Sequence, residues 1–117
     1  MSIKVDELKY QIEIDRSRDN LLTDFGKAIL NDRYLLAGED FQDLFARVAS
    51  YYADDQNHAN KIYDNISKLW FMPATPILSN GGTDRGLPIS CFLNETEDSL
   101  EGIQELWSEN VWLAARG

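Results

Sequence analysis

The only cysteine of this 117-residue chain, Cys91, is the residue best suited to redox chemistry. A free cysteine is commonly a small, buried apolar residue, so a structural role is one interpretation. A redox cysteine instead needs an accessible thiolate and a second sulfur for a disulfide. Because the chain has no second cysteine, a disulfide of Cys91 requires another segment or another polypeptide.

Other polar residues offer weaker signals. His58 is the only histidine and has no cysteine near it, so we expect a solvent-facing or capping residue and no metal site. Asp98 precedes a helical pattern, where an aspartate can cap the helix. The glycine-rich stretch 81–86 lacks the spacing of a phosphate-binding loop and predicts a flexible turn.

The net charge of the chain argues against two classes of binding partner, nucleic acids and anionic membranes. Eleven basic and twenty acidic residues give a formal net charge of -9. This charge repels nucleic-acid phosphates and leaves no basic cluster for an anionic membrane, so we expect neither partner. No apolar run approaches the roughly 18 residues of a membrane helix. The N-terminus also lacks the apolar region of a secretory signal, so we expect a cytoplasmic protein.

The N-terminal residues must position these groups. Residues 5–14 alternate apolar and polar from Leu8 onward, which predicts a short strand or an extended arm. A helical pattern follows over 21–29, after a plausible cap at Asp19-Asn20. The side chains expected on the inner face of the arm and the helix are Leu8, Tyr10, Ile12, Ile14, Leu21, Leu22, Phe25, Ala28 and Ile29.

Two further helices are predicted. The first has Glu39 and Asp40 in its first turn, and the second runs over about 55–70. Three amphipathic helices joined by short links predict a small helical layer. The side chains expected to be buried are Phe41, Leu44, Phe45, Val48, Ala49, Tyr52, Ile62, Ile66, Leu69 and Trp70.

The pattern then changes. Residues 72–88 hold all three prolines and three of the seven glycines, which argues against a regular helix. The apolar run 89–93 has the length of a buried strand whose pairing partners lie elsewhere. A last helix is predicted after the cap Asp98-Ser99. Its apolar residues repeat at helical spacing: Leu100, Ile103, Leu106, Trp107, Val111 and Ala114.

Specific motifs lie in the block 69–117, LWFMPATPILSNGGTDRGLPISCFLNETEDSLEGIQELWSENVWLAARG. This block closely resembles the large (α) subunit of ribonucleotide reductases, in which M-P-A-T-P-x-L-x-N-G-G leads to S-C-F-L and then D-S-L-E-G-I. The stretch 33–39 resembles the family's RYL-LPGE segment, with Ala37 where proline is frequent. The resemblance covers nearly the whole chain, loosely before residue 20 and specifically after residue 68.

The resemblance implies a mainly α fold in two parts. Residues 1–70 would be an N-terminal helical domain. Residues 71–117 would begin a ten-stranded α/β barrel, with a substrate loop, the first strand and a dimer-interface helix. Another polypeptide would complete the barrel.

The resemblance also implies roles for individual residues. Cys91 matches one half of the cysteine pair that is oxidised to a disulfide as the ribose is reduced. Thr75 and Ser90 match residues that contact the substrate nucleotide. Asp98 matches a residue that binds the ribose of the dNTP or ATP effector. The 98–115 helix matches one that packs against a second α protomer.

The implied function is radical-based reduction of ribonucleotides to deoxyribonucleotides for DNA replication. It would be the activity of a ribonucleoside-diphosphate reductase, present only in an assembled α subunit and not in this chain alone. The segment would bind no cofactor itself. The assembled enzyme would need a dithiol reductant and a radical generator, either a metal-containing small subunit or adenosylcobalamin.

The residues leave other origins and functions open. The chain could be one half of a naturally split subunit, joined by a C-terminal portion, or a fragment of a longer one. The alternative function is a non-catalytic helical module that docks on a reductase and modulates its dimerisation.

Overall fold

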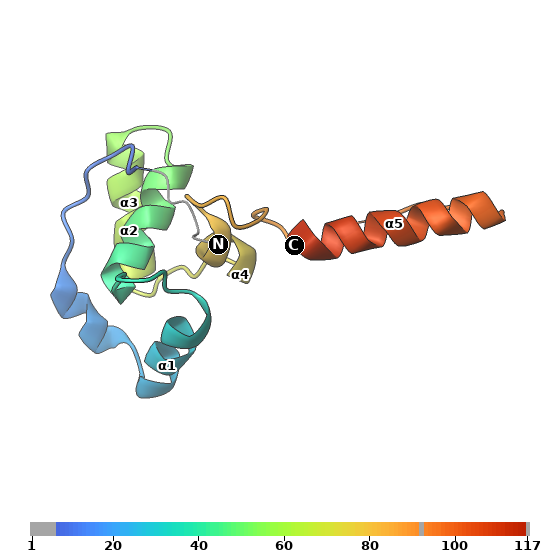
Figure 1. Cartoon of the computed structure of the whole chain (residues 1–117). Coiled ribbons are helices and arrows are strands. Elements are labelled where there is room, and N and C mark those ends of the chain that lie inside the picture. The colour runs from blue at the N-terminus through green and yellow to red at the C-terminus, as the bar shows by residue number, and fades with distance from the viewer. Residues whose placement is uncertain (1–6, 92, 117) are drawn as a thin grey trace.

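A computed structural model describes residues 7–91 and 93–116 of the chain (Figure 1). A body of short helices forms one end of the molecule, and a single long helix projects from it. The helical segments are η1 (Arg16–Leu21, a 3-10 helix), α1 (Asp24–Arg33), α2 (Phe41–Tyr52), α3 (Gln56–Ser67), α4 (Thr75–Asn80) and α5 (Leu100–Arg116).

Helix α2 forms the centre of the body and packs against η1, α1, α3 and α4. The predicted stripe is confirmed, because Leu44, Phe45, Val48 and Ala49 are buried in the core. Phe41 and Tyr52 at the two ends of the helix pack against that core while staying partly accessible. Burial of this stripe explains why α2 is helical: its apolar residues recur at the spacing of one helix face.

Helix caps set the ends of α2 and α3. Asp40 is the N-cap of α2 and lies outside its first turn, and its N–H donates to the Asp43 carboxylate at 3.0 Å. Asp55 caps α3 by accepting the N–H of His58 at 2.8 Å. These side chains satisfy amides that have no partner within a helix.

The predicted start of the first helix is wrong. Asp19 and Asn20 lie within η1, and Thr23 caps α1 by accepting the N–H of Gly26 at 3.0 Å. Several residues in this stretch are good caps, and tertiary contacts select among them. The predicted inner face also differs, because Leu30 is buried whereas Leu21, Phe25, Ala28 and Ile29 are exposed.

The third predicted helix extends too far. Helix α3 ends at Ser67, and Leu69 turns the chain with a positive φ of 60°. Ile66 is buried as predicted, but Leu69 and Trp70 are exposed, Trp70 by 75%. The turn directs these side chains away from the α2–α3 contact, where Tyr63 lies instead.

The N-terminal arm is extended and forms no strand over its described residues 7–15. The predicted alternation holds from Tyr10 onward, because Tyr10, Ile12 and Ile14 are partly buried while the residues between them are exposed. Leu8 is exposed, and residues 5 and 6 of the predicted element lie outside the described part. Ile12 and Ile14 pack against the helical core.

Two predictions for residues 72–93 need correction. Residues Thr75–Asn80 form the short helix α4, since Pro76 occupies the first helical turn, where a missing N–H costs nothing. The predicted strand 89–93 is absent from its described residues, and Phe92 lies outside them. A strand needs a neighbour for its backbone hydrogen bonds, and the described residues contain no other strand.

Helix α5 lies mostly outside the body and lengthens the molecule to 58 Å by 33 Å by 30 Å. Its C-terminal end lies beside α4, and its N-terminal end points away from the other helices (Figure 1). Ser99 caps the outer end by accepting the N–H of Gly102 at 3.0 Å. The large exposed apolar side chains of α5 are Leu100, Ile103, Trp107, Val111 and Trp112.

Candidate functional site

A cavity of about 500 Å³ lies between α4, the chain that follows it and the end of α5. The cavity brings together Thr75 and Ser90, the two residues matched to substrate contacts. The residues that line it are Thr75, Pro76, Ser79, Asn80, Arg85, Ser90 and Ala115. Among the described residues of this lining there is one arginine and no carboxylate. The cavity therefore favours a polar or anionic ligand, in contrast to the acidic chain as a whole.

Thr75 is held at the first position of α4. Its hydroxyl lies 2.9 Å from the hydroxyl of Tyr34, within hydrogen-bond distance. The Ser79 hydroxyl donates to the Thr75 carbonyl at 2.9 Å, one turn along the short helix. Thr75 is thus positioned by a helix and by a side chain from the connection between α1 and α2.

The loop after α4 is tied to the helix at two points. The Thr83 hydroxyl donates to the Asn80 carbonyl at 2.8 Å, and the Arg85 N–H donates to the Thr83 hydroxyl at 3.2 Å. Farther along, the Asn80 side-chain amide donates to the Leu87 carbonyl at 2.7 Å. The stretch predicted to be a flexible turn is therefore fixed on both sides of Arg85.

A buried ion pair stabilises the C-terminal end of α4. The Arg47 side chain on α2 is only 3% exposed and meets the Glu39 carboxylate at 3.0 Å and 3.1 Å. Its guanidinium also donates to the carbonyls of Gly81 and Leu78 at the end of α4. Arginine suits this place because its rigid fork of donors can serve several acceptors at once.

Gly81 permits a close approach between α4 and α2. A Cβ at this position would lie 2.7 Å from the Ile77 carbonyl and 2.7 Å from the Tyr52 ring. The Tyr52 hydroxyl is buried and has no hydrogen-bond partner among the described residues. Burial raises the pKa of this hydroxyl.

Cys91 follows Ser90 directly, and its residue is exposed with a free thiol. The interpretation of Cys91 as a buried structural cysteine is therefore wrong. An exposed thiol is accessible to a second sulfur, as disulfide exchange requires.

Asp98 is not brought to this cavity. It lies, exposed, at the outer end of α5, and the neighbouring Ser99 makes the cap there. The structure thus groups Thr75 and Ser90 around one cavity, while Cys91 only follows Ser90 in sequence and Asp98 lies apart from both.

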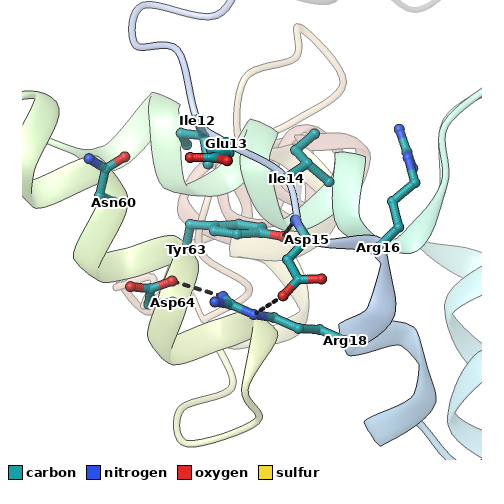
Figure 2. Close-up of a pocket in the computed structure, with 9 residues that line it drawn as sticks. All are labelled: Ile12, Glu13, Ile14, Asp15, Arg16, Arg18, Asn60, Tyr63 and Asp64. Carbon is teal, nitrogen blue, oxygen red and sulfur yellow. Dashed lines mark hydrogen bonds and ion pairs between the residues drawn. The ribbon is translucent and has the colours of Figure 1, made fainter.

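A second cavity, of about 700 Å³, lies between the N-terminal arm and α3 (Figure 2). Its two arginines already have carboxylate partners. Arg18 pairs with Asp64 at 2.8 Å, and Arg16 pairs with Asp40 and Asp43 at 3.1 Å each. Since these guanidiniums are engaged, the cavity is a weaker candidate for an anionic ligand.

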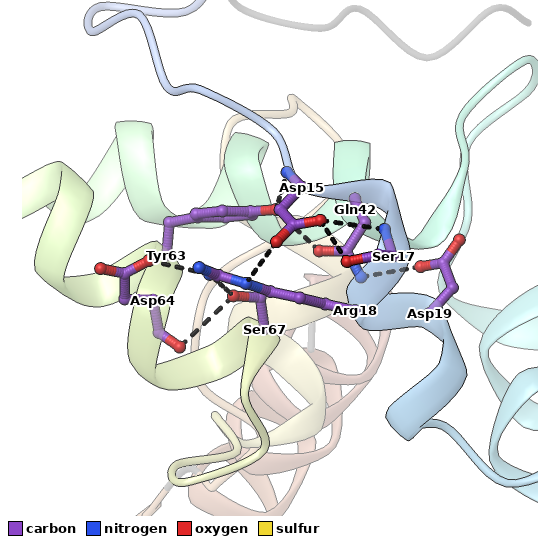
Figure 3. Close-up of polar contacts among 8 residues, drawn as sticks. All are labelled: Asp15, Ser17, Arg18, Asp19, Gln42, Tyr63, Asp64 and Ser67. Carbon is purple, nitrogen blue, oxygen red and sulfur yellow. Dashed lines mark hydrogen bonds and ion pairs between the residues drawn. The ribbon is translucent and has the colours of Figure 1, made fainter.

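The same region contains a polar network that joins η1 to α3 (Figure 3). The Asp15 carboxylate accepts from the hydroxyl and the N–H of Ser17 at 2.5 Å and 3.0 Å. These hydrogen bonds lower the pKa of Asp15. Arg18 donates to Asp64 and, at 2.6 Å, to Ser67, and the bond to Asp64 raises the pKa of Arg18.

Tyr63 extends this network into the core. Its hydroxyl accepts the Asp15 N–H at 3.0 Å and donates to the Gln42 side chain at 2.8 Å. Gln42, itself buried, donates to Asp19 at 2.7 Å. Burial is the main cause of the raised pKa of Tyr63. The network connects the arm and η1 to α2 and α3, which is a structural role.

The His58 side chain is 42% exposed, which agrees with the solvent-facing alternative, and the cap of α3 is Asp55. The His58 Nδ1 accepts the N–H of Asp54 at 3.1 Å.

Across the part of the chain that the structure describes, no group of three or more histidine, cysteine or acidic side chains could hold a metal ion. The described helices also include none with the length and apolar character needed to cross a membrane.

Comparison with known proteins agrees with the resemblance seen in the sequence. The sequence model described as "Ribonucleotide reductase, all-alpha domain" matches residues 20–86. The chain is 41% identical over 100 residues to the ribonucleoside-diphosphate reductase large subunit of Invertebrate iridescent virus 3, covering 84% of this chain and 16% of that protein.

Two other relatives match a similar part of the chain. The large subunit of Acanthamoeba polyphaga mimivirus is 40% identical over 113 residues, covering 86% of this chain and 13% of that protein. The ribonucleoside-diphosphate reductase α subunit of Helicobacter pylori (strain ATCC 700392 / 26695) is 32% identical over 115 residues, covering 90% of this chain and 15% of that protein. The chain thus spans about a sixth or less of the length of these relatives.

Proposed function

The chain belongs to the ribonucleotide reductase large-subunit family, and we propose that it contributes to ribonucleoside-diphosphate reduction as the N-terminal part of an assembled large subunit. The observation that carries the proposal is the shared cavity. Thr75 and Ser90 line one polar space, and the exposed thiol of Cys91 follows Ser90 directly. Cys91 does not itself line the cavity, so the proposal requires that the thiol reach the substrate in the assembled subunit.

In the proposed reaction the ribose 2′-hydroxyl is replaced by hydrogen and leaves as water. Two thiols supply the two electrons and become a disulfide. Cys91 is one of them, and the second thiol comes from the remaining part of the large subunit, because this chain has a single cysteine. A dithiol reductant then restores both thiols.

The radical that starts this reaction comes from outside the segment. A metal-containing small subunit or adenosylcobalamin would supply it. The contribution of this chain's own residues is to hold the substrate through Thr75 and Ser90 and to present the Cys91 thiol. Hydroxyl groups are suited to the first task because they can donate to phosphate or ribose oxygens.

Two further parts of the proposal concern α5. Its exposed apolar residues, among them Trp107 at 71%, form a surface that a second α protomer would cover. Asp98 at the outer end of the same helix would hydrogen-bond the ribose of a dNTP or ATP effector. Effector site and dimer surface would then share one helix, so effector binding could act on the dimer contact.

The test is ribonucleoside-diphosphate reduction by the assembled large subunit, supplied with its radical generator and a protein dithiol reductant. We expect Cys91→Ser to abolish sustained turnover and Thr75→Val to raise KM. Asn57→Ala changes an exposed residue on α3 and is the matched control, so it should leave both the sustained turnover rate and KM unchanged. Full turnover by Cys91→Ser with the protein reductant would exclude the redox role.

A further inference from the structure

Arg85 lines the cavity with Thr75 and Ser90 but matches no residue assigned a role above. We propose that Arg85 is a substrate-positioning residue whose guanidinium binds the phosphate groups of the nucleotide. This inference rests on the proposed function, since it takes the cavity to be the place where the substrate lies.

The charge of the cavity is the first argument. Among the described residues that line it, Arg85 is the only ionisable one. In contrast, the cavity along α5 is lined by three carboxylates, those of Glu101, Glu105 and Glu109. Within a chain of net charge -9, a cavity whose described lining has one cation and no carboxylate is a place where a phosphate can bind without repulsion from these side chains.

The availability of the guanidinium is the second argument. The other arginines near the core have carboxylate partners, as Arg18 has Asp64 and Arg47 has Glu39. No ion pair of the Arg85 side chain is found among residues 7–91 and 93–116. Arginine binds phosphate through two parallel N–H donors, so an unpaired guanidinium beside two hydroxyls provides a fitting donor set.

The position of Arg85 is the third argument. Its backbone N–H is bound to the Thr83 hydroxyl, and Thr83 in turn is bound to the end of α4. The Asn80 amide fixes Leu87 on the other side. The loop therefore holds the Arg85 backbone at the C-terminal end of α4, beside the cavity that Thr75 also lines, before any ligand binds. Such preorganisation reduces the entropy that binding must offset.

The experiment is an NMR titration of the whole 117-residue chain with pyrophosphate, with ADP and with adenosine. We expect pyrophosphate and ADP to shift the Arg85 Nε–H signal together with the amides of Thr75 and Ser90. In Arg85→Gln both affinities should fall by about 10-fold or more, as for the loss of a charged hydrogen bond. Arg33→Gln, at an exposed site outside the cavity, is the matched control.

The outcomes separate this inference from the proposed function. If Thr75→Val and Ser90→Ala weaken ADP binding while Arg85→Gln does not, the inference is wrong and the substrate cavity stands. If the Arg85 signal does not move, or if Arg33→Gln weakens binding as much as Arg85→Gln, the inference is also overturned. If ADP binds but all three cavity variants bind it as the wild type does, the substrate cavity itself is wrong.

Discussion

Replacement of Arg47 by methionine should destabilise the helical body more than any surface change. Methionine keeps much of the length of the side chain but removes every donor. The change leaves the Glu39 carboxylate, 11% exposed, without its partner, and removes a donor from the carbonyls of Leu78 and Gly81. Breaking a buried ion pair from one side costs about 3–5 kcal/mol.

That loss is a large fraction of the roughly 5–15 kcal/mol by which domains are usually stable. Urea denaturation followed by far-UV circular dichroism measures it. Tryptophan fluorescence is a poor probe of this core, because Trp70, Trp107 and Trp112 are all exposed. The midpoint should fall strongly for Arg47→Met.

Two variants make the reasoning refutable. Arg33→Met removes an arginine that is 77% exposed and pairs with Asp32 at 3.4 Å, so it should cost no more than about 1 kcal/mol. The double variant Arg47→Met/Glu39→Gln should recover part of the loss, because no unpaired carboxylate remains. If Arg47→Met costs as little as Arg33→Met, the buried ion pair does not support α4 as described.

Three other changes have definite expected outcomes. Tyr52→Phe should be neutral or slightly stabilising in urea denaturation, because the hydroxyl that it removes is buried without a partner; a loss above about 1 kcal/mol would indicate a hidden partner. Gly81→Ala should cost about 1–3 kcal/mol, since its methyl group would lie 2.7 Å from the Tyr52 ring; an unchanged midpoint would mean that α4 shifts freely. The Ser17 hydrogen bonds lower the pKa of Asp15 in the folded chain. The ionised Asp15 carboxylate therefore stabilises the folded state fully above the ordinary pKa of 3.8, and this stabilisation is lost as pH falls through the lowered pKa. Acid titration of Asp15→Asn should therefore show a smaller loss of stability below pH 3.8 than the wild type, and equal losses would contradict this role.

The central helix α2 and the N-terminal arm could largely be predicted from the sequence. Helix α2 is buried along one regular stripe, so its predicted apolar spacing agrees with the structure, although the helix begins at Phe41 and leaves Glu39 and Asp40 outside its first turn. The arm could be predicted for a similar reason, since Tyr10, Ile12 and Ile14 alternate with exposed residues. In both cases local pattern and tertiary burial agree.

Prediction failed where burial does not follow apolar periodicity. Gln42 and Arg47 are buried although a polar residue on a helix is ordinarily assigned to solvent, and only their distant partners explain it. Phe25 is 76% exposed although its spacing placed it inside. The 3-10 helix η1 was missed because its charged residues bind side chains on α2 and α3, which no local pattern reveals.

The candidate site was only partly predictable. The motif around Cys91 and the positions of Thr75 and Ser90 came from the resemblance to a family. Their grouping around one cavity required the fold, since α4 and residues 85–90 come together through the side chain of Asn80. Arg85 was missed because a lone arginine in a glycine-rich stretch has no distinguishing pattern.

The most direct test of the central claim is the fate of the Cys91 sulfur during one turnover. The assembled large subunit is fully reduced, freed of reductant, given its radical generator and a ribonucleoside diphosphate, and then quenched with an alkylating agent. Peptide mass spectrometry should find Cys91 in a disulfide with a cysteine from the remaining part of the subunit, in proportion to the deoxyribonucleotide formed. Product formation with Cys91 still fully alkylated would contradict the account.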